Sequence, residues 1–70
     1  MSEVPTILVN GEHRPWHVGL QVAQLLENLG TPPNSVATAL NGHFLPRAQR
    51  EHTLLKPGDS LHVFKAIEGG

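Results

Sequence analysis

The first hydrophobic stretch of this chain has the composition of a β-strand and leads into a tight turn. The apolar and β-branched run Thr6–Val9 is followed at once by Asn10-Gly11, a dipeptide typical of two-residue hairpins because both positions accept a positive φ. A second strand is therefore expected over about Arg14–Val18. Pro15 has no N–H to donate to a sheet, which predicts a short or edge strand. Trp16 is predicted to lie in the core.

The next apolar residues recur with the period of an α-helix. Four side chains spaced by three or four residues form one hydrophobic stripe of about three turns, and polar residues occupy the opposite face. Residues 19–21 offer no N-terminal cap, whereas Gly30 suits a left-handed C-terminal position and Pro32-Pro33 prevents continuation. The stripe consists of Val22, Leu25, Leu26 and Leu29, and the polar face of Gln24, Glu27 and Asn28.

The second half of the chain indicates three more strands. Val36–Leu40 alternates between two faces and leads through Asn41-Gly42 into a short strand at His43–Leu45, which Pro46 ends. The mostly polar segment Arg47–Lys56 is expected to be a loop or a short helical turn. After a turn at residues 57–59, a final strand is predicted over residues 60–66. Its inward side chains are Leu61 and Val63, and its outward ones are His62, Phe64 and Ala66.

This order of elements predicts an α+β fold of the β-grasp (ubiquitin-like) kind. One main helix packs across a mixed sheet of four to five strands, and the final strand must pair parallel to the first to close the core. Residues 1–66 are expected to form a single domain. Residues 67–70 are expected to form an extended, flexible and reactive C-terminal Gly-Gly tail.

Composition narrows the function classes further. Seventy residues make one domain with little volume for a deep catalytic cleft, which favours a carrier, a binding module or a subunit over an enzyme. The chain has no cysteine and a formal net charge of −1. It therefore lacks disulfides and thiolate metal ligands, and no basic run supports nucleic-acid binding.

Localisation and metal binding follow from the same composition. The apolar runs are too short to cross a membrane, and residues 1–5 lack the features of a signal peptide. We therefore expect a cytoplasmic protein that is a monomer when alone. The five histidines show no spacing typical of metal ligands, so no metal site is expected.

Several segments, taken in order, resemble the ThiS family of sulfur carriers in thiamine biosynthesis. They are Gly19–Leu26 at the helix entry, Ala39–Arg47 with the sequence ALNGHFLPR, Lys56–Asp59, and the final Gly69-Gly70. The last predicted strand is also similar to that of ubiquitin. Gln21 departs from the family pattern, which often has a capping threonine there.

The resemblance implies that the chain is a protein co-substrate and not an enzyme. A carboxylate anion is a poor electrophile, so a ubiquitin-activating-type adenylyltransferase is expected to convert the Gly70 carboxylate to an acyl-adenylate. Sulfur derived from a cysteine desulfurase then attacks and leaves a thiocarboxylate on Gly70. Thiazole synthase receives this sulfur for the thiazole ring of thiamine. No cofactor is expected on this chain, because ATP and the sulfur donor are used by the partner enzymes.

Delivery of the carboxyl group requires a thin tail and a docking surface. Ile67, Glu68, Gly69 and Gly70 span about 13 Å when extended, which is long enough to enter a partner's active site. The outward face of the sheet is expected to dock. Two arginines either pair with acidic residues of the activating enzyme or are simply solvated. The predicted docking residues are His62, Phe64, Ala66, Ala37, Ala39, Arg47 and Arg50.

Three alternatives remain open at this point. The small subunit of molybdopterin synthase uses the same tail chemistry. A ubiquitin-like protein modifier would instead form isopeptide bonds through Gly70. A plain interaction domain would carry an inert tail.

Overall fold

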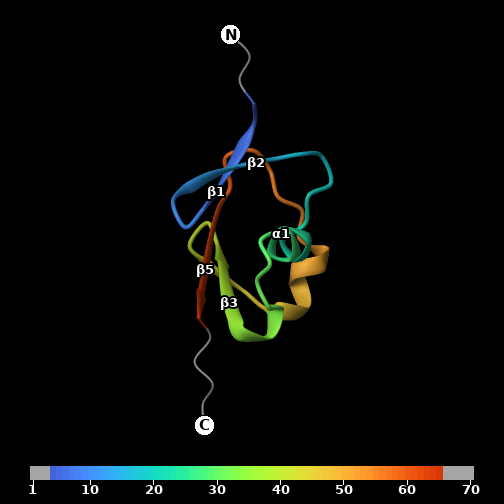
Figure 1. The fold of residues 1–70 in the computed structure, drawn as a ribbon, viewed down its shortest axis with the longest axis vertical. Coiled ribbons are helices and arrows are strands. Elements are labelled where there is room, and N and C mark those ends of the chain that lie inside the picture. Colours follow the sequence, from blue (N-terminus) through green and yellow to red (C-terminus); the bar gives the residue numbers. More distant parts are fainter. Residues whose placement is uncertain (1–3, 66–70) are drawn as a thin grey trace.

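A mixed β-sheet with a helical layer on one face makes up the described part of the chain, residues 4–65 of a computed structural model. The last strand in the sequence lies at the centre of this sheet (Figure 1). The elements are β1 (Thr6–Val9), β2 (Glu12–Pro15), α1 (Val22–Asn28), the 3-10 helix η1 (Pro33–Ser35), β3 (Val36–Leu40), β4 (His43–Leu45), the 3-10 helix η2 (Arg47–His52) and β5 (Ser60–Lys65). The strand order is β2-β1-β5-β3-β4.

The strand pairing confirms the predicted topology. β5 runs parallel to β1, with Val9 opposite Leu61, and antiparallel to β3, with Thr38 opposite Val63. β2 and β4 add to the outer edges of β1 and β3 as antiparallel hairpin partners. The prediction that the final strand pairs parallel to the first is therefore confirmed.

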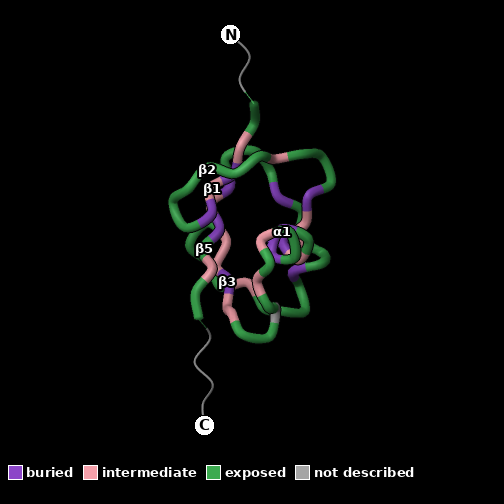
Figure 2. The backbone as a smooth tube through the Cα atoms, in the orientation of Figure 1, coloured by how far each residue is buried: buried purple, intermediate pink, exposed green. Residues whose placement is uncertain are grey.

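The hydrophobic core lies between the sheet and the layer formed by α1 and the segments around it (Figure 2). Burial of one large aliphatic side chain contributes about 1.5–3 kcal/mol. With no cysteine in the chain, this packing and the sheet hydrogen bonds hold the fold. The buried apolar residues are Ile7, Val9, Leu20, Val22, Leu25, Leu26, Leu55 and Leu61.

The second strand begins earlier than the sequence indicated. β2 spans Glu12–Pro15 and not Arg14–Val18. Asn10 and Gly11 have positive φ values of 53° and 84°, so the chain reverses within two residues and pairs immediately after the turn. β2 lies at an edge of the sheet, as predicted. Trp16 is half-buried against the core, and its indole N–H donates a 2.7 Å hydrogen bond to a main-chain carbonyl.

The helix is shorter than predicted. α1 ends at Asn28 after seven residues, which is about two turns, and Leu29 forms its C-cap. Gly30 then takes a φ of 72°, the left-handed conformation expected of it. No side-chain hydrogen bond caps the start at Gln21. The main-chain N–H of Val22 instead donates to the carbonyl of Thr53, at 3.1 Å, so a neighbouring loop replaces the missing cap.

The polar segment after β4 forms a helical turn, one of the two forms predicted for it. It contains η2, at Arg47–His52, which packs against α1. β5 is described as far as Lys65, and Ala66 lies outside the described residues. Within residues 4–65, no helix has the length and the apolar composition needed to cross a membrane.

Candidate functional site

The sheet face opposite the helices brings together most of the predicted docking residues. In the antiparallel pairing of β3 and β5, Ala37 lies opposite Phe64 and Ala39 lies opposite His62. Their neighbour Leu61 faces the core and is fully buried, so strand alternation places these four side chains on the outer face. Phe64 is 49% exposed, and the two alanines are half-buried. The result is a low, partly apolar surface at the centre of the sheet.

Phe44 belongs to the same surface, although it was not among the docking residues predicted from the sequence. It pairs with Ala39 across β3 and β4, so its ring lies on the outer face, where it is 67% exposed. Two phenylalanines therefore stand on the strands to either side of β3, whose alanines leave the surface between them low. The alternation of His43–Leu45 could have revealed this, because Leu45 packs toward the core. We call Phe44, Phe64, His62, Ala37 and Ala39 the outer-face patch.

The prediction that Arg50 belongs to a docking surface is wrong, because this residue is only 4% exposed. Its Nε donates to the hydroxyl of Thr38 at 3.2 Å, and one of its terminal nitrogens donates to the carbonyl of Val36 at 2.7 Å. The Thr38 hydroxyl in turn donates to the carbonyl of Leu45 at 3.0 Å. Arg50 therefore joins η2 to the inner face of β3 and has a structural role.

Burial also changes the acidity of Arg50. Desolvation, and to a smaller extent the nearby positive charge of Arg47, lower the pKa of the Arg50 guanidinium from its ordinary value. The hydrogen bonds to Thr38 and Val36 give partners to buried N–H groups of this side chain. Sequence reasoning could not detect this, because arginine is usually exposed.

Arg47 is exposed, but it does not lie on the outer-face patch. It belongs to η2, on the helical side of the sheet, and donates a 2.9 Å hydrogen bond to Asn34. With Glu27 and Glu51 it lines a hollow of about 260 Å³ between α1 and η2. This hollow carries charges of both signs, so it does not select a ligand of one charge.

The tail residues and the last predicted docking residue lie outside the described part of the chain. These residues are Ala66, Ile67, Glu68, Gly69 and Gly70. The last described residue, Lys65, ends β5 and pairs with Val36 at the end of β3. The segment that leads to Gly70 therefore follows directly from the central strand. Among the described residues, no three histidine, aspartate or glutamate side chains gather closely enough to hold a metal ion.

Comparison with solved structures places this fold in a known class. The chain is similar to the crystal structure of the thiamine biosynthesis protein ThiS from Geobacter metallireducens, with a TM-score of 0.78 and 29% identity. That likeness covers 93% of this chain and 99% of the other. A solution structure of a thiamine biosynthesis protein from the same organism gives a TM-score of 0.71, also at 29% identity, covering 93% of this chain and 87% of that one. The β-grasp prediction is thus confirmed.

Sequence comparison identifies the family. The ThiS family model matches residues 7–70. The chain is 33% identical over 64 residues to the sulfur carrier protein ThiS of Escherichia coli (strain K12), covering 91% of this chain and 97% of that protein. It is also 30% identical over 64 residues to a thiazole synthase of Paramagnetospirillum magneticum, covering 91% of this chain but only 20% of that protein. The chain belongs to the ThiS family, as its sequence motifs predicted.

Proposed function

We propose that this chain is the sulfur carrier of thiamine biosynthesis, with the carboxyl group of Gly70 as the carrying group. The observation that carries the proposal is the continuous match of the ThiS family model from residue 7 to Gly70. The match includes the central strand β5 and the Gly-Gly sequence that follows it. The protein is a co-substrate and not a catalyst.

The chemistry has two steps at one carbonyl carbon. The Gly70 carboxylate attacks the α-phosphate of ATP, which forms an acyl-adenylate and releases pyrophosphate. A sulfide or persulfide sulfur then adds to the carbonyl carbon, and the C–O bond to AMP breaks. With a persulfide donor, a thiol must also attack and cleave the S–S bond, so that a thiocarboxylate remains on Gly70. Since neither step needs a thiol from this chain, its lack of cysteine is compatible with the role.

The partners follow from this chemistry. A ubiquitin-activating-type adenylyltransferase performs the first step, and a sulfur source derived from a cysteine desulfurase supplies the second. Thiazole synthase accepts the sulfur. The similarity to a thiazole synthase supports this enzyme as a partner. This chain aligns with 20% of that protein, which therefore joins a ThiS-like sequence to a thiazole synthase in one polypeptide. All these proteins act in the cytoplasm in this proposal.

The outer-face patch is the surface through which these partners bind. We expect Phe44→Ala and Phe64→Ala each to raise the KM for this chain at least about fivefold in the adenylation assay, because exposed aromatic anchors dominate many interfaces. The kcat should be unchanged, since both rings belong to the sheet and take no part in the reaction at the Gly70 carboxyl group. The matched control is Val18→Ala, which truncates an apolar residue that is 84% exposed in the loop before α1. Equal KM values for all three variants would show that the outer-face patch is not part of the interface.

One reaction tests the proposed function against its alternatives. The full chain is incubated with ATP, a ThiS-activating adenylyltransferase and a sulfide source, and its intact mass is measured. Replacement of one carboxyl oxygen by sulfur increases the mass by about 16 Da, as expected for nucleophilic sulfur transfer. No change under conditions that modify an authentic ThiS protein would overturn the proposal. Conjugates of higher mass would indicate a protein modifier.

A further inference from the structure

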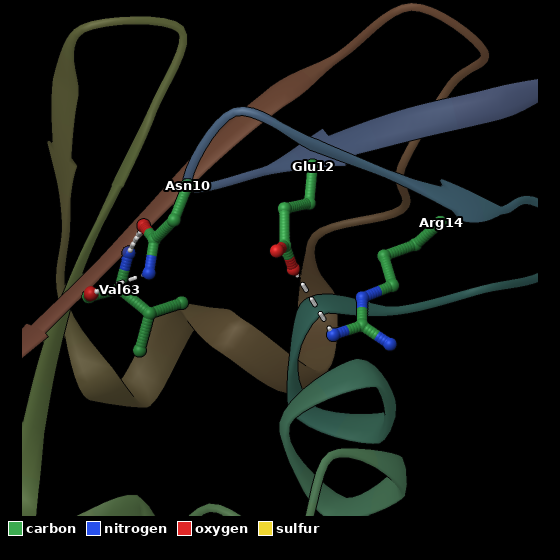
Figure 3. Close-up of polar contacts among 4 residues, drawn as sticks. All are labelled: Asn10, Glu12, Arg14 and Val63. Atoms are coloured by element: carbon green, nitrogen blue, oxygen red, sulfur yellow. Dashed lines mark hydrogen bonds and ion pairs between the residues drawn. The ribbon is translucent and has the colours of Figure 1, made fainter.

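Asn10 makes an unusual set of contacts for a turn residue. It occupies the first position of the β1–β2 turn, with a φ of 53°. Its side chain reaches β5, where Nδ2 donates to the carbonyl of Val63 at 3.1 Å and Oδ1 accepts from the N–H of Val63 at 2.8 Å (Figure 3). Its main-chain N–H donates to the carbonyl of Leu61 at 3.0 Å. Asn10 thus makes hydrogen bonds to Leu61 and Val63, which lie on the same edge of β5.

These contacts replace a strand that is missing on this side of β5. The pairing of β1 with β5 reaches only Leu8 opposite Ser60 and Val9 opposite Leu61. At Asn10 the chain reverses into β2. The Asn10 carboxamide then offers one donor and one acceptor to Val63, as a peptide group of a neighbouring strand would.

The other side of β5 is held by β3 for longer. That pairing continues through Ala37 opposite Phe64 to Val36 opposite Lys65. On the β1 side, Val63 is therefore the last residue of β5 with described hydrogen bonds. On the β3 side, the described pairing of β5 extends to Lys65. The described end of β5 is therefore supported on both of its edges.

We infer that Asn10 is a positioning residue for the reactive carboxyl group. By holding Val63, it supports the C-terminal half of β5 on the edge that β1 leaves unpaired, while β3 holds the other edge. A pre-ordered strand end loses less conformational entropy when the tail enters a partner's active site, which favours binding. This inference rests on the proposed sulfur-carrier function and adds a residue to it.

The chain provides a matched control in its other Asn-Gly turn. Asn41 has nearly the same φ, 52°, and its side chain also binds β5. Its Oδ1 accepts from the N–H of Ser60 at 2.9 Å, and its Nδ2 donates to Asp59 at 3.1 Å. Asn41 thus holds the first residue of β5, whereas Asn10 holds its fourth. Glycine accepts a positive φ at either site, so Asn10→Gly and Asn41→Gly keep the turns and remove only the side-chain contacts.

The test compares the two variants with the unchanged chain in adenylation by the activating enzyme. We expect Asn10→Gly to raise the KM for the carrier about tenfold with kcat unchanged, because binding loses pre-organisation while the bound carboxyl group is the same. Asn41→Gly should stay within about twofold. Amide hydrogen exchange of Val63, measured relative to the other β5 amides, should quicken at least about tenfold in Asn10→Gly alone. Asn10→Asp keeps the turn but sets a carboxylate oxygen against the carbonyl of Val63, so its KM should rise at least as far as that of Asn10→Gly.

The outcomes separate this inference from the proposed function. If the unchanged chain is adenylated but Asn10→Gly and Asn41→Gly have the same KM, Asn10 has no positioning role. A fall in kcat without a change in KM would also overturn it. If the unchanged chain is not adenylated at all, the sulfur-carrier function fails, and the positioning role fails with it. Should Asn10→Gly not fold, Asn10→Asp is compared with the unchanged chain, and an equal KM for the two would overturn the positioning role.

Discussion

Deletion of Gly70 is expected to abolish thiocarboxylate formation and to leave the unfolding midpoint unchanged. The deletion moves the reactive carboxyl group back by one extended residue, about 3.3–3.6 Å, whereas a misplacement of about 1 Å can already slow a reaction about 100-fold. The buried core residues of the described part of the chain lie between Ile7 and Leu61, so we expect the fold to tolerate the loss of residue 70. Intact mass after reaction measures the first effect, and thermal unfolding measures the second.

The control for this deletion is Gly70→Ala. It keeps the length and the carboxyl group but adds a Cβ beside the reacting carbon. We expect this variant to react measurably but more slowly than the unchanged chain, because only the fit of the tail is altered. A Gly70 deletion that forms thiocarboxylate as fast as the full chain would contradict a role for this carboxyl group.

Replacement of Arg50 by alanine is expected to lower the free energy of unfolding by about 2–4 kcal/mol. The variant loses the hydrogen bonds from the charged side chain to Thr38 and Val36, and the carbonyl of Val36 loses that partner. A domain of this size has a total stability on the order of 4–10 kcal/mol, so this is a large fraction. Urea unfolding followed by circular dichroism or Trp16 fluorescence measures the change.

Arg47→Ala is the matched control, because it removes the same charge from the same helical turn. Arg47 is exposed and makes a surface hydrogen bond to Asn34, so its loss should cost less than about 0.5 kcal/mol. Similar stabilities for the two variants would show that the buried network around Thr38 does not hold η2 to the sheet.

The sequence predicted those parts of the fold that depend on local chemistry. The two Asn-Gly turns and the left-handed Gly30 were predicted because few residues accept a positive φ. The inward side chains of β5 were predicted because strand alternation has a fixed period of two. The boundaries of β2 and α1 were less accurate, because pairing and capping by Thr53 come from segments distant in the sequence.

Two features of the site were missed because they depend on contacts between residues distant in the sequence. Arg50 looked like a surface residue because its burial depends on Thr38 and Val36, which belong to another element. Likewise, nothing local to Asn10 indicates that its side chain binds Val63, 53 residues later. A hydrogen bond between residues distant in the sequence can be recognised only when the topology is known, so a single sequence does not reveal it.

The proposed role of the Gly70 carboxyl group in carrying sulfur can be tested by locating the sulfur atom in the reacted chain. The full chain, after reaction with ATP, the activating enzyme and sulfide, is fragmented intact in a mass spectrometer. We predict that the increase of about 16 Da from sulfur addition appears only in fragments that contain the C-terminal Gly70. An unmodified C-terminal fragment, with the added mass elsewhere in the chain or absent, would show that the Gly70 carboxyl group does not carry sulfur.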